Sequence, residues 1–163
     1  MLYSFPGGPE GAGPYGVTRD STGNLYGVTA AGGGSTGAAG SGLVFELNSS
    51  GNYAVLYSFT GGSDGSGPGA APLRDPAGNL YGTTVYGGTT DCSGGCGVVY
   101  RVNPSGQETV LYSFTGGADG SNPYAGLVAD PTGNLYGTTP WGGKGGSGAV
   151  TFSGGGVVFE IKP

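Results

Sequence analysis

The sequence "GNLYG" at residues 23–27 returns at 78–82 and again at 133–137, so successive copies lie 55 residues apart. A catalytic motif is normally needed once in a chain. A motif that returns at a fixed interval belongs to a structural unit that is itself repeated. The spacing therefore predicts a repeat architecture for this chain of 163 residues.

Longer strings surround each copy in a constant order. "LYSF" is followed by "GG", by a proline, by "D..GNLYG.T", by a second "GG" and finally by "G.V(F/Y)". The last two units share "LYSFTGG.DGS" and "GNLYGTT" letter for letter. We therefore read residues 1–163 as a single repeat domain made of the units 2–55, 56–110 and 111–163.

Each unit predicts four short strands and no long helix. In unit three they are residues 124–129, 134–139 and 156–161, and unit two shows the fourth at 108–114. "DPTG" joins the first strand to the second and "NPSG" the third to the fourth, with Pro and Gly where tight turns favour them. A long loop separates the second strand from the third, so the unit is a four-stranded antiparallel meander.

The predicted third strand has apolar residues on both faces. Val157, Phe159 and Ile161 alternate with Val158 and Glu160, so neither face is cleanly polar. A sheet that is apolar on both faces must be covered on both faces. Sheets stacked around an axis achieve this, which predicts an all-β, β-propeller-like fold with three four-stranded blades of about 55 residues.

These motifs resemble known propeller repeats. "DPTGNLY" at residues 130–136 resembles the turn of NHL-type blades, and the unit with "LYSF", "GNLYGTT" and "GGVVFEI" is similar to the bacterial GloVer tandem repeat. The resemblance covers essentially the whole chain. It implies a β-propeller-like fold on a secreted or surface-anchored bacterial protein, and it implies neither an enzymatic activity nor a particular ligand.

Composition narrows the class of partner. The chain has 41 Gly and 11 Pro, but its hydrophobic residues (36%) recur in register, which favours a folded protein over a disordered one. The net charge is −5 with only five Lys and Arg, whereas nucleic-acid binding needs a basic patch. No apolar stretch approaches the length of a membrane span.

The two cysteines bear on the compartment. Cys92 and Cys96 lie in the glycine-rich string "DCSGGC" of a chain without His. A structural zinc ion usually takes four ligands, so two thiols are a poor metal site and a local disulfide is the better interpretation. A disulfide favours an oxidising compartment, and we expect the protein at the cell surface or outside the cell.

The two ends of the chain predict self-association. The N-terminal string "LYSF" matches the predicted fourth strand of a unit, although no unit stands before it: Leu2, Tyr3, Ser4 and Phe5. Unit three, by contrast, lacks a fourth strand. We expect this N-terminal strand to complete the last blade, of the same chain or, in preference, of a neighbour. Because three blades fall short of the usual ring of about four to eight, two chains would form a six-bladed ring, or many a filament.

Few residues are candidates for chemistry. Asp20, Asp75 and Asp130 occupy a turn position where Asp bonds nearby backbone N–H groups. Asp64 and Asp119 in the "DGS" loops are weak calcium candidates, because calcium prefers several hard oxygen ligands. Without His, free Cys or a distinctive Ser, no nucleophile and base stand out, so we expect no enzyme and no cofactor.

The long loops offer a second hypothesis. In a meander the loops between blades and those between second and third strands emerge on one face, which would carry Tyr86, Trp141, Lys144 and Phe152. Exposed aromatic rings on such a face suit a glycan or a protein partner, although large aromatic rings also pack between blades. A structural assembly module is thus the first hypothesis, and a lectin-like propeller is the alternative.

Overall fold

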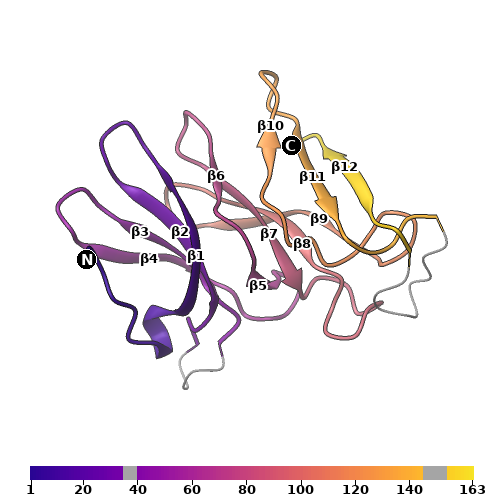
Figure 1. The fold of residues 1–163 in the computed structure, drawn as a ribbon, viewed down its shortest axis with the longest axis horizontal. Helices are drawn as coiled ribbons and strands as arrows, with labels where there is room; N and C mark the ends of the chain where they lie inside the picture. Colours follow the sequence, from indigo (N-terminus) through magenta and orange to yellow (C-terminus); the bar gives the residue numbers. More distant parts are fainter. Residues whose placement is uncertain (35–39, 145–153) are drawn as a thin grey trace.

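Three antiparallel sheets follow one another along the molecule in the computed structural model, which describes residues 1–34, 40–144 and 154–163 (Figure 1). Sheet 1 comprises β1 (Ala12–Arg19), β2 (Leu25–Ala31), β3 (Leu43–Leu47) and β4 (Tyr53–Ser58), preceded by the 3-10 helix η1 (Gly8–Glu10). Sheet 2 comprises β5 (Ser66–Pro68), β6 (Leu73–Arg74), β7 (Leu80–Tyr86), β8 (Val98–Val102) and β9 (Glu108–Ser113). Sheet 3 comprises β10 (Val128–Ala129), β11 (Leu135–Thr139) and β12 (Val157–Ile161).

The meander order predicted from the sequence is confirmed. Sheet 1 is ordered β1-β2-β3-β4, and every described strand pair is antiparallel. The second and third strands keep one register in all three units, pairing Leu25 with Leu47, Leu80 with Val102, and Leu135 with Ile161. In the described part of the chain, no helix has the length and apolarity that a membrane crossing needs.

The first strands are shorter than predicted. Residues 124–129 were expected to form one strand, but only Val128–Ala129 pairs, and unit two splits its first strand into β5 and β6. Units two and three carry one more residue than unit one between the proline and the turn aspartate. Sheet 1 already needs an irregularity between Pro14 and Val17, and the additional residue enlarges it into a break in the ladder.

The turn aspartates explain the first half of the "GNLYG" motif. The Asp75 carboxylate accepts hydrogen bonds from the Asn79 backbone N–H (2.8 Å), the Asn79 amide (2.7 Å) and the Tyr81 hydroxyl (3.1 Å). Asp20 and Asp130 accept the equivalent bonds in the other units. Burial alone would raise the pKa of Asp20, but hydrogen bonds from the Thr22 hydroxyl and N–H, the Asn24 N–H and the Tyr26 hydroxyl outweigh it and lower the pKa to about 2. The stabilisation is therefore present at neutral pH and is lost as the pH falls through about 4 towards 2.

The second glycine of the motif makes room for an aromatic ring. A Cβ atom added at Gly82 would lie 2.4 Å from the Tyr100 hydroxyl oxygen, and one at Gly27 or Gly137 would lie 2.5 Å from the Phe45 or Phe159 ring. Each ring belongs to the third strand of the same sheet. The first residues of the motif therefore form a turn, and its last glycine leaves space for an aromatic ring of the third strand. Each unit needs both features once, so the motif appears once per unit.

The hydrophobic core lies between successive sheets. Sheets 1 and 2 bury one cluster, which includes Val28, Val44, Phe59, Val98 and Tyr100. Sheets 2 and 3 bury a second cluster, which includes Val99, Phe114, Leu127, Leu135 and Phe159. Sheet 2 is therefore covered on both faces, as its two apolar faces require.

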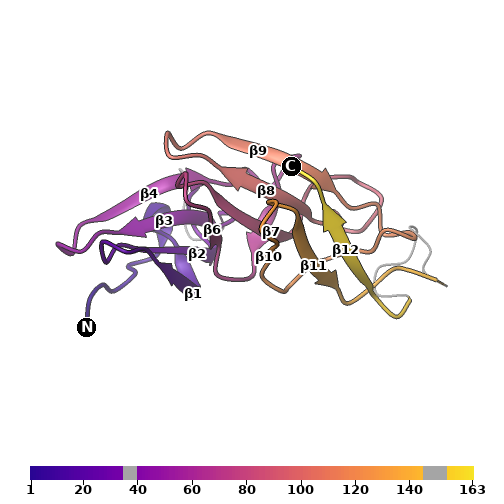
Figure 2. The same ribbon diagram turned by 90° about the horizontal axis from the view of Figure 1, so that it is seen from above.

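The N-terminal segment does not complete sheet 3 within the chain. Residues 2–5 form no strand, and they pack on sheet 1, where Tyr3 stacks on Tyr53 with ring centroids 4.3 Å apart. Sheet 3 keeps three strands, and β12 lies at the opposite end of the molecule from the N-terminus in both views (Figures 1 and 2). The three sheets thus form an open series rather than a closed ring.

Candidate functional site

One aromatic contact recurs wherever an outer strand meets the next sheet. Phe59, just after β4, packs on Tyr100 of sheet 2 at 5.0 Å between ring centroids. Phe114, just after β9, packs on Phe159 of sheet 3 at 5.1 Å. Phe5 makes the same contact with Phe45 of sheet 1, also at 5.1 Å, from a segment that belongs to no sheet.

Backbone hydrogen bonds reinforce each joint between sheets. The N–H of Gly67 donates to the carbonyl of Ser41 in the preceding unit at 2.7 Å. The N–H of Asn122 donates to the carbonyl of Cys96 at the same distance. Pro68 and Pro123, which follow these donors, lie so close to Gly42 and Gly97 that an added Cβ would be 2.6 and 2.8 Å from the proline Cδ. The shared proline and glycine letters of the repeat therefore serve the joints.

The calcium candidates are engaged in structural bonds. The Asp64 carboxylate accepts from the Tyr57 hydroxyl (2.9 Å), the Thr60 N–H (2.7 Å) and the Thr60 hydroxyl (2.6 Å). Asp119 accepts the same three bonds in the next unit, and Glu10 accepts the Tyr3 hydroxyl. Within residues 1–34, 40–144 and 154–163, no group of three or more His, Cys, Asp or Glu could hold a metal ion. These acids hold the loops between sheets to the outer-strand tyrosines.

Glu108 departs from this pattern of satisfied acids. It begins β9 opposite Val102, at the position that Tyr53 occupies in sheet 1. Its Oε1 atom is buried and accepts no hydrogen bond from the described residues. Burial, aided by the negative charge of Asp64, raises the pKa of Glu108 to about 7. The folded protein therefore holds this proton more tightly than the unfolded chain does.

We expect Glu108 to make stability fall as the pH rises from about 4.5 to about 7, because only the folded state keeps the carboxyl protonated over that range. Glu108→Gln should remove this dependence. Its melting temperature should match the parent near pH 5 and exceed it near pH 8, by on the order of 2 °C. Thermal melts across this pH range test the expectation, and a pH dependence that persists in the variant would contradict it.

The outer face of sheet 1 resembles one side of the contacts between sheets, but no other sheet covers it in the described structure. Val17 is 48% exposed there, whereas Leu127, which lies over Gly137 as Val17 lies over Gly27, is 7% exposed in the joint between sheets 2 and 3. The same face carries an apolar hollow of about 260 Å³, lined by residues that include Phe5, Pro14 and Phe45. This face is called the head.

The outer face of sheet 3 is the complementary half. Val158 is 78% exposed, whereas its counterparts Val44 in sheet 1 and Val99 in sheet 2 are fully buried by the sheet that follows each of them. Val128 beside it is 65% exposed. This face, with the unpaired edge of β12, is called the tail.

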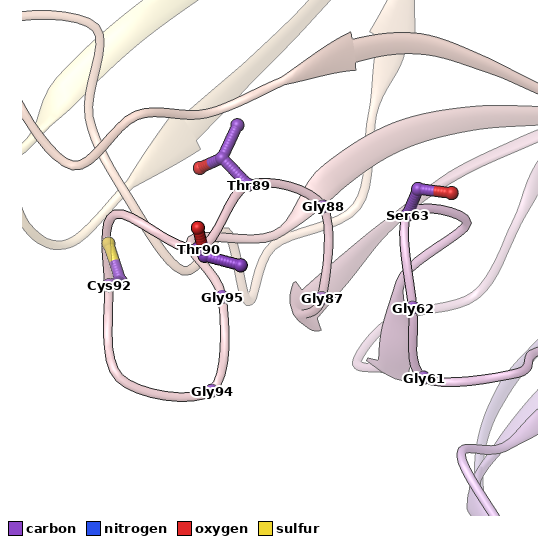
Figure 3. Close-up of a pocket in the computed structure, with 10 residues that line it drawn as sticks. All are labelled: Gly61, Gly62, Ser63, Gly87, Gly88, Thr89, Thr90, Cys92, Gly94 and Gly95. Carbon is purple, nitrogen blue, oxygen red and sulfur yellow. The ribbon is translucent and has the colours of Figure 1, made fainter.

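A third surface is an open hollow of about 460 Å³ beside the Cys92–Cys96 disulfide, shown in Figure 3. Most of its lining residues are glycines, and its side-chain polar groups are the hydroxyls of Ser63, Thr89 and Thr90. A Cβ at Gly87 would lie 2.5 Å from the Gly65 Cα, so close backbone packing explains a glycine there without a ligand. The disulfide predicted from the sequence is confirmed.

The residues predicted to bind a ligand lie near the long loops. The two loop classes meet at one end of the sheets, since Gly88 N–H donates to the Gly62 carbonyl (2.9 Å) and Gly143 N–H to the Gly117 carbonyl (2.9 Å). Trp141 is partly exposed and its carbonyl accepts from the Ser121 N–H at 3.0 Å. Lys144 is exposed, and Phe152 lies outside the described residues.

Tyr86 is 40% exposed, and its partner Tyr124 is not among the residues predicted to bind a ligand. A hydrogen bond between the Tyr124 and Tyr86 side chains, together with burial and the nearby Tyr15, raises the pKa of Tyr124. Tyr15 and Tyr124 both follow the proline of their unit, which is the signal that would have found them. A binding role for Tyr86, Trp141, Lys144 and Phe152 stays a prediction.

Comparison with known proteins places the chain among repeat proteins. A family model described as the Gloeobacter/Verrucomicrobia repeat matches residues 1–163. Among curated proteins, none matches the chain in sequence.

Two solved structures share the fold. A candidate gluconolactonase superposes with a TM-score of 0.51 at 19% identity, over 77% of this chain and 41% of its own. A streptogramin B lyase superposes with a TM-score of 0.51 at 15% identity, over 92% of this chain and 40% of its own. Both are propeller-like proteins, and this chain spans about two fifths of each.

Proposed function

Because this chain belongs to the Gloeobacter/Verrucomicrobia repeat family, we propose that it is a non-enzymatic β-propeller repeat module of the cell surface or extracellular space that assembles through its head and tail. The observation that carries the proposal is the contrast between Val158, which is 78% exposed, and its fully buried counterparts Val44 and Val99. The same side chain is a core residue wherever another sheet follows it.

The unpaired edge of sheet 3 supports an assembly role. β12 pairs with β11 on one side, and no described strand lies on its other side. An apolar edge strand offers a row of N–H and C=O groups to any strand of matching pattern, and proteins usually pair or cover such an edge. A specific partner strand would satisfy these groups and bury Val158 together.

The engaged acids support a non-enzymatic role. Asp64, Asp75 and Asp119 each accept hydrogen bonds that hold a turn or loop, so their place in the repeat has a structural explanation. The Cys92–Cys96 disulfide supports an oxidising compartment, because such bonds persist outside the reducing cytosol.

Light scattering coupled to size-exclusion chromatography tests the assembly role. We expect the parent chain to run as a particle of two or more chains, and Val158→Asp to shift it towards the monomer by placing a charge in the contact. Ser105→Asp is the control, because it adds the same charge to an exposed turn of the covered sheet 2. A parent that is monomeric at every concentration, or a Val158→Asp variant that associates like the parent, would refute the proposal.

A further inference from the structure

We propose that the partner of the tail is the head of a second copy of this chain, whose Leu2–Phe5 segment becomes the missing outer strand of sheet 3. Two chains joined in this way at both ends form a closed ring of six sheets. The inference rests on the assembly role proposed above and adds the partner, the contact and the strand register.

The N-terminal segment already lies where the outer strand of a preceding sheet would lie. Outer-strand Phe59 and Phe114 pack on Tyr100 and Phe159 of the next sheet, and Phe5 packs on Phe45 of sheet 1 with the same separation of 5.1 Å that joins Phe114 to Phe159. The tyrosine two residues before each of these phenylalanines also makes an equivalent contact, a hydrogen bond to an acidic side chain. Tyr57 and Tyr112 donate to Asp64 and Asp119, and Tyr3 donates to Glu10. The head is therefore a joint that lacks only the sheet to which Leu2–Phe5 would belong.

The register of the new strand pair follows from the two complete sheets. In sheet 1 Leu43 lies opposite Ser58, and in sheet 2 Val98 lies opposite Ser113. The matching residues are Val157 of the tail and Ser4 of the partner's head. The Phe59 N–H donates to the Gly42 carbonyl and the Phe114 N–H to the Gly97 carbonyl, each at 3.0 Å. The Phe5 N–H of the second copy would donate likewise to the Gly156 carbonyl.

A proline–glycine contact also joins successive sheets, and the head and the tail each carry one of its two residues. Pro68 and Pro123 pack on Gly42 and Gly97 of the preceding sheet. Pro14 is the equivalent proline of unit one, and it lines the hollow of the head. Gly156 is the equivalent glycine of unit three, and it precedes β12 in the tail. Docking the head of one copy on the tail of another would bring Pro14 onto Gly156. Val158 would then be covered as Val44 and Val99 are.

A second copy fits these surfaces because one chain carries both halves of the joint at opposite ends (Figures 1 and 2). The ends of a single chain therefore cannot meet without rebuilding the fold. A head-to-tail contact between identical chains closes into a ring when its rotation fits and otherwise extends into a filament. Two copies give six sheets, within the usual range of about four to eight blades for a closed propeller.

Disulfide cross-linking tests the register. In sheet 2 the hydrogen bond from Phe114 to Gly97 makes Val98 and Ser113 a non-hydrogen-bonded pair, whose Cα atoms lie about 4.5 Å apart in antiparallel sheets. That spacing falls within the range that a disulfide can bridge. The double variant Ser4→Cys/Val157→Cys should therefore oxidise to a covalent dimer. In Ser4→Cys/Val158→Cys, the matched control, the second side chain points to the other face of the strand and no cross-link should form.

Four outcomes are distinguishable on a non-reducing gel with peptide mapping of the linked residues. A covalent dimer linked between positions 4 and 157 of different chains, with the control unlinked, supports the inference. A ladder of larger species overturns the two-chain ring while keeping the head-to-tail contact. An associated protein without this cross-link, or with it inside one chain, overturns the inference and leaves an assembly role. A protein that is monomeric in solution refutes both proposals.

Discussion

Phe114→Ala should destabilise the protein by about 3–5 kcal/mol, the range for removing a large aromatic side chain from a core. Phe114 is fully buried, and its ring contacts both Phe159 of sheet 3 and Tyr112 of its own sheet. The loss is large against the roughly 5–15 kcal/mol that stabilises a typical domain. We therefore expect sheet 3 to separate from sheet 2 well before the parent unfolds.

Denaturant unfolding followed by circular dichroism and by the fluorescence of Trp141, the single tryptophan, measures this effect. Phe5→Ala is the matched control, because Phe5 makes the same contact with Phe45 in the partly exposed head. Its cost should be well below that of Phe114→Ala in a dilute sample, where association does not contribute. Equal costs for the two variants would show that the joint between sheets 2 and 3 is not the buried core described above.

Asn122→Ala should cost about 2–5 kcal/mol through two separate effects. Asn122 is fully buried, and its amide donates to the Val85 carbonyl at 2.8 Å, so the change leaves a buried acceptor without this partner, at about 1–3 kcal/mol. Asn122 is also the one non-glycine residue with positive φ (54°) among the described residues. Alanine adopts that conformation at a further cost of about 1–2 kcal/mol.

Asn122→Gly separates the two effects. The equivalent positions in units one and two are Gly13 (φ 66°) and Gly67 (φ 63°), so glycine suits the backbone and loses the hydrogen bonds that the Asn122 amide donates to the Val85 and Gly95 carbonyls. We expect this variant to be more stable than Asn122→Ala by about 1–2 kcal/mol in denaturant unfolding. If the alanine variant were as stable as the glycine variant, the backbone at this position would not be strained.

Much of the local structure could be predicted from the sequence, because its signals act over a few residues and occur three times. The turn aspartates and the tight turns were found, and the second and third strands predicted for unit three lie within a residue of their observed bounds. The Cys92–Cys96 disulfide spans only four positions, so its formation also needed no knowledge of the fold. The aspartates Asp64 and Asp119 were recognised as repeated, but their tyrosine partners lie seven residues away on another element and were not.

The sequence by itself determined the repeat, the all-β class and the need to cover both faces of each sheet, since these follow from spacing and alternation alone. Only the tertiary structure decided which faces stay open and where the N-terminal segment Leu2–Phe5 lies. The sequence of Leu2–Phe5 matches an outer strand but does not say which sheet the segment contacts. Its position depends on tertiary contacts, namely Phe5 against the Phe45 ring and Tyr3 stacked on Tyr53. The shortening of the first strand in unit three to Val128–Ala129 was likewise decided in three dimensions. One extra residue is tolerated in a loop, but it interrupts a ladder whose partner strand is fixed.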